Sequence, residues 1–154
     1  MKNIKYNLAS DSWGDEEISA INDVIKSNRY TMGPKVKKFE EEFAHYFNSK
    51  YAIMVNSGSS ANLLMIASLF YSKDYNLKKG DEVIVPAVSW STTYYPVTQY
   101  GLKLIFVDID RNTLNIDPKE VIKAINPKTK LIFAVNLLGN PCDLDDLKSI
   151  CKKN

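Results

Sequence analysis

Short apolar runs alternate along this chain with longer stretches in which apolar residues recur every three or four positions. A run of four or five residues, bounded by polar or turn-forming residues, is typical of a strand buried on both faces of a parallel sheet. The sequence therefore predicts four strands, over residues 51–55, 82–85, 104–107 and 131–135.

The stretches with helical spacing lie before, between and after these runs. Val36, Phe39, Phe43 and Phe47 recur on one side of a stretch that follows Pro34, and we expect this side to be buried. Asp117-Pro118 pairs an acceptor side chain with proline, which is a strong signal for a helix start. The predicted helices cover about 15–26, 34–47, 59–70, 94–100, 117–125 and 143–153.

Strands that alternate with helices predict an α/β fold. We expect a three-layer sandwich with a mostly parallel sheet and helices on both of its faces. In such sheets ligands bind beyond the carboxyl ends of the strands. That rule selects four segments as one candidate rim: 57–60, 86–93, 108–110 and 136–141.

The segment 55–62, Val-Asn-Ser-Gly-Ser-Ser-Ala-Asn, joins the first predicted strand to a helix. Gly58 allows backbone angles that a side chain would forbid, and a serine at the N-cap favours the helix start. The first amides of a helix lack intrahelical partners and face the positive end of the helix dipole, so this turn is a candidate anion site. The alternative is an ordinary strand-to-helix turn, since no lysine follows as a P-loop requires.

Trp90 lies in a loop rich in hydroxyl groups and outside any apolar periodic stretch. An exposed indole at the rim could stack on a flat ring, and the alternative is that the indole packs beneath its own loop.

Proton-transfer groups are harder to find. We interpret Asp108 and Asp110 as turn and cap residues, and His45 as a surface residue of the second helix.

Composition is that of an ordinary soluble domain. The 154 residues are 45% hydrophobic and 25% charged, and 20 basic against 18 acidic residues give a net charge of +2. No basic stripe marks a nucleic-acid interface, so we expect no nucleic-acid partner.

The cysteines and the apolar runs bear on location. Cys142 and Cys151 form no C-x-x-C pair and no metal-ligand cluster, and we predict reduced thiols and no metal. Cys142 has no neighbouring His or Lys that would activate it as a nucleophile. We find no apolar run long enough for a signal peptide or a membrane span, so we expect a cytoplasmic protein without a membrane partner.

Five motifs, in order and spacing, carry a family resemblance. Thr31-Met32-Gly33-Pro34, the segment 55–62, Gly80-Asp81-Glu82-Val83-Ile84-Val85-Pro86, Phe106-Val107-Asp108-Ile109-Asp110 and Asn136-Leu137-Leu138-Gly139-Asn140-Pro141 resemble the DegT/DnrJ/EryC1/StrS family. These are sugar aminotransferases and dehydratases that depend on pyridoxal phosphate. The resemblance implies the large domain of the aspartate aminotransferase-like fold, with residues 1–34 as an N-terminal segment and first helix and 35–154 as an incomplete cofactor-binding domain.

The resemblance also implies a site and a reaction. Gly58 and Ser59 would hold the phosphate of pyridoxal or pyridoxamine phosphate, Trp90 would stack on its ring, and Asn136 would also contact it, while Met32 and Gly33 would contact substrate. Asn136, and the segment 86–96 around Trp90, favour the branch that removes the C3 hydroxyl of a nucleotide-linked 4-keto-6-deoxyhexose for surface polysaccharide (O-antigen) biosynthesis. The aminotransferase branch usually has His at position 136.

The chain departs from the family in length. Members are more than twice as long, and their catalytic Lys or His, like the Asp that pairs with the pyridine nitrogen, is expected beyond Asn154. We therefore expect the amino-terminal portion of such an enzyme, a homodimer when full length. The alternatives are a sugar aminotransferase and an inactive truncated fragment.

Overall fold

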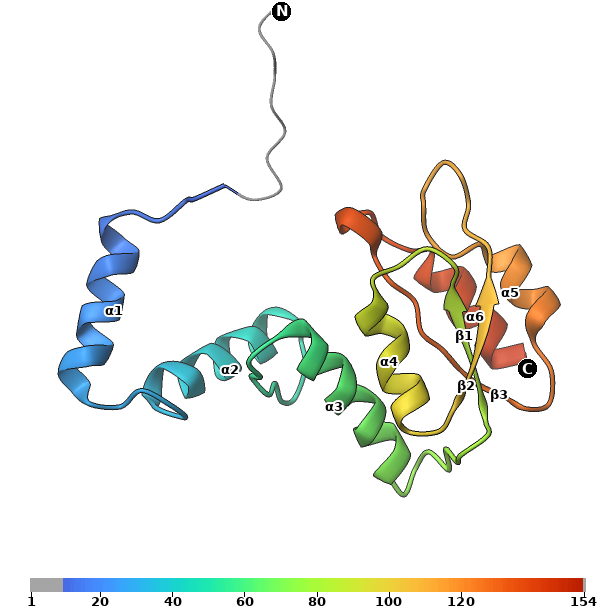
Figure 1. Ribbon diagram of the computed structural model, residues 1–154, viewed down its shortest axis with the longest axis horizontal. Coiled ribbons are helices and arrows are strands. Elements are labelled where there is room, and N and C mark those ends of the chain that lie inside the picture. The colour runs from blue at the N-terminus through green and yellow to red at the C-terminus, as the bar shows by residue number, and fades with distance from the viewer. Residues whose placement is uncertain (1–9, 154) are drawn as a thin grey trace, which may run out of the picture. The chain divides into compact units, whose positions relative to one another are not determined.

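The computed structural model describes residues 10–153 of the chain (Figure 1). They divide into two compact units, one ending at Met54 and the other beginning at Val55. The predicted division into residues 1–34 and an incomplete cofactor-binding domain, 35–154, describes domains of a longer enzyme. The two units here are defined by contacts within this chain alone, so that division stays a prediction. No helix among the described residues is both long and apolar enough to cross a membrane.

The first unit contains two helices, α1 (Asp15–Ser27) and α2 (Pro34–Tyr46). Glu17 caps α1 by accepting a hydrogen bond from the Gly14 amide at 2.7 Å, and Pro34 occupies the first turn of α2. Both helices were predicted within two residues of their observed ends.

The predicted burial of one side of α2 is wrong. Phe39, Phe43 and Phe47 are 48%, 44% and 58% exposed, and their rings contact one another along the helix, with centroids 5.5 and 4.6 Å apart. Helical spacing identifies which residues share a face, but two helices alone bring too little chain together to enclose that face.

The predicted strand at 51–55 does not form. These residues have no regular secondary structure and no strand partner among the described residues, and Tyr51 and Ile53 are 76% and 71% exposed. The Met54 amide donates to the Glu40 carboxylate at 2.8 Å in place of a ladder bond. An apolar run becomes a strand only where another strand lies beside it, which the run itself cannot specify.

The second unit is an α/β sandwich. Its elements in chain order are α3 (Gly58–Tyr71), β1 (Glu82–Pro86), α4 (Ser91–Gln99), β2 (Lys103–Val107), α5 (Pro118–Ala124), β3 (Thr129–Ile132), the 3₁₀ turn η1 (Leu137–Gly139) and α6 (Leu144–Lys153). The three strands described pair in parallel in the order β2-β1-β3, with Ile84 opposite Ile105 and Ile132.

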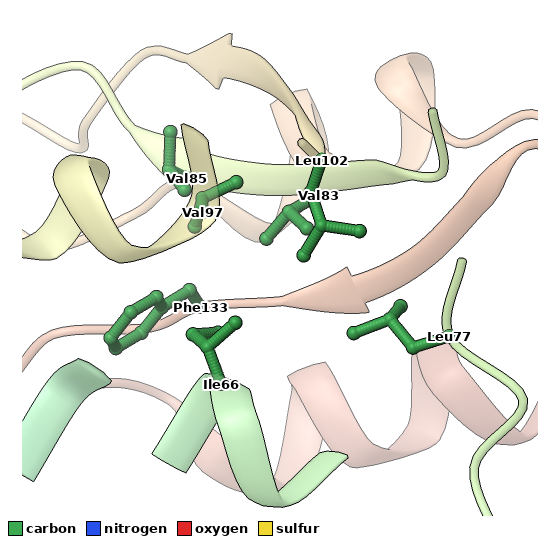
Figure 2. Close-up of a cluster of buried hydrophobic side chains, with 7 residues drawn as sticks. All are labelled: Ile66, Leu77, Val83, Val85, Val97, Leu102 and Phe133. Carbon is green, nitrogen blue, oxygen red and sulfur yellow. The ribbon is translucent and has the colours of Figure 1, made fainter. Parts of the chain in front are cut away.

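The central strand β1 supplies both cores. Val83, Ile84 and Val85 are fully buried, as expected for a strand covered on both faces. Val83 and Val85 pack on one side with residues from α3, α4 and the end of β3 (Figure 2). Ile84 packs on the other side with residues from α5 and α6, which lie across the sheet from α4 in Figure 1. The predicted three-layer α/β arrangement is therefore confirmed.

The bounds of α4 and β3 differ most from prediction, and β3 begins at Thr129, two residues before its predicted start. α4 begins at Ser91, three residues before the predicted start, although Pro96 lies inside it. β3 ends at Ile132, but the Phe133 amide still donates to the Ile84 carbonyl at 2.8 Å, so the chain leaves the sheet gradually toward Asn136.

Candidate functional site

The start of α3 presents two backbone donors without acceptors. The Ser57 hydroxyl caps the helix by accepting from the Ser60 amide at 3.1 Å, and the Ala61 amide donates to the Ser57 carbonyl at 3.0 Å. Within the described chain, the amides of Gly58 and Ser59 have no acceptor. They lie at the positive end of the α3 dipole, so they can hold an anion.

Gly58 contributes space and not unusual backbone geometry. It is the first residue of α3 and does not have a left-handed φ, so the expectation that it adopts angles forbidden to a side chain is wrong. A Cβ built on Gly58 would meet nothing within 4 Å, and residues 57–59 are exposed, so the turn is open to solvent. The exposed turn can therefore accept a group as large as a phosphate.

Trp90 stands at the start of α4, beyond the carboxyl end of β1. It is the N-cap residue of α4, and its carbonyl accepts from the Thr93 amide at 2.9 Å. The side chain is 76% exposed, so it does not pack beneath its own loop. An exposed indole on a fixed backbone can offer its face to a flat ring.

The loop that carries Trp90 is fixed by three polar contacts. The Ala87 amide donates to the Val107 carbonyl at 2.8 Å and extends the sheet ladder by one bond. The Tyr94 hydroxyl donates to the Pro86 carbonyl at 2.9 Å, and the hydroxyls of Ser89 and Thr93 are 2.8 Å apart. Burial raises the pKa of Tyr94, although the Ser89 hydroxyl partly opposes this, so Tyr94 stays a hydrogen-bond donor at neutral pH.

The helices α3 and α4 are joined by a side chain that the sequence did not single out. The Asn62 amide nitrogen donates to the Thr92 carbonyl at 3.1 Å, and the residues are half-buried. This bond links the second turn of α3, which carries the free amides at its start, to the first turn of α4, which follows Trp90. An asparagine in a stretch with helical spacing gave no sign of a partner 30 residues away.

Asn136 follows β3 and lies in an exposed loop. Its side-chain oxygen accepts from the Cys142 amide at 2.9 Å, so its amide nitrogen is the group left to meet a ligand. The Cys142 thiol is buried and donates to the Val135 carbonyl at 3.0 Å. Burial raises the pKa of Cys142, which agrees with the prediction that it is not a nucleophile.

The loops after β2 and β3 are held together by Asn115, which was also missed. It is 3% exposed and donates to the carbonyls of Asn140 and Pro141 at 3.0 and 2.9 Å. Its side-chain oxygen accepts from the Leu137 amide at 3.1 Å. Asn115 stands between two apolar residues, and only the tertiary structure shows that its amide is satisfied by backbone groups.

The aspartates at this edge serve turns, as predicted. The Asp110 carboxylate accepts from the amides of Thr113 and Asn112 at 3.0 and 2.8 Å, and these backbone bonds lower its pKa. Asp108 accepts from the Ile109 amide at 2.8 Å. His45 is exposed on α2, as expected.

Met32 and Gly33 belong to the first unit, whereas Gly58, Ser59, Trp90 and Asn136 all belong to the second. Met32 is 78% exposed with a left-handed φ of 47°, and Gly33 is the N-cap of α2. Met32 is therefore free to contact a ligand, whereas Gly33 is half-buried.

Comparison with known proteins shows which family this chain matches. The model of the DegT/DnrJ/EryC1/StrS aminotransferase family matches residues 11–154. The chain is 59% identical over 147 residues to GDP-4-keto-6-deoxy-D-mannose 3-dehydratase from Yersinia pseudotuberculosis. The matched stretch covers 96% of this chain and 37% of that protein.

Solved structures give the same result. The Escherichia coli GDP-4-keto-6-deoxy-D-mannose-3-dehydratase with bound hydrated PLP is 58% identical with a TM-score of 0.91, over 97% of this chain and 38% of that one. A mutant GDP-4-keto-6-deoxymannose-3-dehydratase with bound GDP-perosamine is 59% identical with a TM-score of 0.90, over 95% and 38%. The chain thus spans less than two fifths of these relatives, and the predicted aminotransferase-like fold is confirmed.

Proposed function

Because the chain belongs to the DegT/DnrJ/EryC1/StrS aminotransferase family, we propose that it forms the phosphate-binding and ring-stacking part of a pyridoxal phosphate enzyme. The proposed reaction is removal of the C3 hydroxyl from a GDP-linked 4-keto-6-deoxyhexose, for surface polysaccharide biosynthesis. Identity of 59% to a GDP-4-keto-6-deoxy-D-mannose 3-dehydratase supports this choice of reaction and substrate.

One observation carries the cofactor proposal. The unpaired amides of Gly58 and Ser59 and the exposed indole of Trp90 lie on two helices that pack together and are joined by Asn62. The open space at Gly58 fits a phosphate, the dipole of α3 favours its charge, and the indole offers a face to the pyridine ring. The relative solved with bound hydrated PLP is 58% identical, which supports this cofactor.

The residues of this chain bind and orient, and they do not transfer protons in the proposed reaction. Pyridoxamine phosphate, when bound, supplies an electron sink for loss of a proton and of the C3 hydroxyl. Gly58 and Ser59 hold the phosphate, Trp90 fixes the plane of the ring, and the Asn136 amide nitrogen donates to a polar group of the cofactor. We assign substrate contact to Met32 and Gly33, and the proton-transfer group to the part of the longer enzyme that follows Asn154.

Location and assembly are part of the same proposal. Cys142 and Cys151 are unpaired thiols, which fits a reducing compartment, and we place the protein in the cytoplasm. We also propose that the full-length enzyme is a homodimer. The family resemblance supports this assembly, and the exposed phenylalanines of α2 form an apolar face that the rest of the enzyme, in the same or the second subunit, would cover.

The experiment that tests the cofactor site is calorimetric titration of the protein with pyridoxal phosphate and with pyridoxamine phosphate. We expect Trp90→Ala to weaken binding about tenfold, because one stacked ring contributes about 1 kcal/mol or somewhat more. Trp13→Ala is the matched control, since Trp13 is 64% exposed in the other unit. Equal losses in the two variants would contradict the assignment of the ring platform to Trp90.

A second candidate is amino transfer to the keto sugar, which the family description favours. Incubation of the longer protein with the GDP-linked 4-keto-6-deoxyhexose and glutamate separates the two reactions. A product without the C3 hydroxyl supports dehydration, and an amino sugar that retains this hydroxyl supports transfer. The same incubation with the 154-residue chain tests the remaining alternative. If this chain binds cofactor but forms neither product, it is an inactive truncated fragment.

A further inference from the structure

Asn62 makes the contact that motivates this inference. Its amide nitrogen donates to the backbone carbonyl of Thr92 at 3.1 Å, between helices α3 and α4. Asn62 lies four residues after Gly58, so it is one turn from the phosphate amides. Thr92 lies two residues after Trp90, in the first turn of α4. A single hydrogen bond therefore joins the two elements that carry the proposed cofactor site.

The Thr92 carbonyl needs an external donor because of Pro96. In an α-helix the carbonyl of a residue accepts from the amide four positions later, and the residue four positions after Thr92 is Pro96, which has no N–H. A half-buried carbonyl without a partner would destabilise the start of α4. The Asn62 amide replaces the donor that proline removes.

The rest of the α3–α4 contact is apolar. Ile66 of α3 and Val97 of α4 lie in the same buried cluster, in which Figure 2 shows only hydrocarbon side chains. Apolar packing is less directional than a hydrogen bond, so a bond between the helices adds to what the packing defines. The Asn62–Thr92 bond has a defined length and direction, so it restrains how far each helix is advanced along its axis.

We infer that Asn62 is a positioning residue that sets the separation between the phosphate-binding amides of α3 and the ring platform at Trp90. This inference rests on the proposed function and deepens it. The phosphate and the ring of one cofactor are joined covalently at a fixed distance, so both contacts form together only if the two helices keep their relative advance. Inorganic phosphate alone does not depend on that separation.

The test compares wild-type protein with Asn62→Ala, Pro96→Ala and the double variant. Exposed Asn76→Ala is the matched control. Affinity for pyridoxal phosphate is measured by calorimetry, affinity for inorganic phosphate by shifts of the Gly58 amide resonance, and stability by urea unfolding. We expect Asn62→Ala to weaken pyridoxal phosphate binding about five- to tenfold, as for one lost hydrogen bond. Phosphate binding should stay within about twofold, because the bond lies outside the phosphate contacts.

The double variant separates positioning from simple stabilisation. Alanine at position 96 restores an N–H, so the Thr92 carbonyl regains a partner inside α4 while the link to α3 stays broken. We expect Asn62→Ala to lower the free energy of unfolding less in the Pro96→Ala background than in the wild-type background. The loss of pyridoxal phosphate affinity should persist. This variant also provides a folded protein if Asn62→Ala alone unfolds.

Several results would overturn the inference. Unchanged pyridoxal phosphate affinity in Asn62→Ala, equal weakening of both ligands, or recovery of affinity in the double variant would each show that Asn62 does not set the separation. If wild-type protein binds phosphate but not pyridoxal phosphate, or binds neither, the proposed function itself fails and the inference fails with it.

Discussion

The side chain of Asn115 donates to the carbonyl of Pro141 at 2.9 Å and so joins the loop after β2 to the loop after β3. The same side chain also bonds to Asn140 and Leu137, and it is almost fully buried. Three bonds from one amide hold the backbone on either side of η1. The position of Asn136, one residue before Leu137, therefore depends on a residue 21 positions earlier in the chain.

Replacement of Asn115 should be the most destabilising polar substitution in this part of the chain. We expect Asn115→Ala to lower the free energy of unfolding by about 2–3 kcal/mol, because two carbonyls and one amide lose a buried partner. Urea unfolding measures this loss. Asn112→Ala is the control, because the side chain of Asn112 is exposed and only its backbone amide is bonded to Asp110. Similar losses in both variants would show that the Asn115 bonds contribute little.

The cap of α3 should allow stability and anion binding to be separated. Ser57→Asp keeps an acceptor for the Ser60 amide and adds a negative charge at the helix start, so it should retain or raise stability. The same charge beside the amides of Gly58 and Ser59 should weaken phosphate binding by about tenfold. Ser57→Asn is the neutral control and should change neither property by much. Tighter phosphate binding in Ser57→Asp would contradict the anion site.

The lowered pKa of Asp110 predicts part of the acid sensitivity. Because its folded-state pKa lies below its unfolded-state value, its contribution is complete above the unfolded pKa and is lost as pH falls through the folded pKa. Asp110→Asn retains an acceptor for the amides of Asn112 and Thr113 but cannot titrate. Between pH 7 and about pH 3 the variant should therefore lose less stability than wild type. Parallel stability curves from urea unfolding at each pH would refute this.

The two cysteines should differ in reactivity. Cys151 is exposed on α6, whereas Cys142 is buried and its thiol donates to Val135. Burial raises the pKa of Cys142 and so reduces the thiolate fraction. Iodoacetamide at pH 8 should label Cys151 first and Cys142 slowly, which peptide mass spectrometry can follow. Cys151→Ser should remove the fast phase, and rapid labelling of that variant would show that the 136–142 loop opens readily.

Local patterns sufficed where one element decides its own structure. Val83, Ile84 and Val85 form a continuous apolar run because both faces of β1 are covered, and the run alone predicted this. A serine cap was predicted at the start of this helix, and the structure shows that Ser57 is that cap, acting on the amide three residues later. Asp110 was recognised as a turn residue for the same reason, since its partners lie two and three positions away.

Structure that depends on distant partners was not predicted. The strand at 51–55 failed because strand formation requires a neighbour, and the face of α2 failed because burial requires a covering element. Asn62 and Asn115 act over 30 and at least 22 positions, so nothing beside them in the sequence marks their roles. The anion site at the 55–62 turn and the stacking role of Trp90 were suggested by the local sequence, the cofactor came from the family motifs, and the residues that position the site came from the structure.

The alternation of β1 between two cores has a consequence for assembly. Val83 and Val85 face one core and Ile84 the other, and aliphatic side chains of similar size do not distinguish the two faces strongly. A register shift of one residue would exchange the two faces without exposing an apolar face to solvent, so polar contacts add to what the cores specify. The polar contacts at the strand ends, Asn126 to Glu82 at 2.7 Å and Tyr94 to Pro86, form only in the native alignment. A shift of one residue would displace the start of α4 by about 3.3 Å, so the position of Trp90 depends on the register of the sheet.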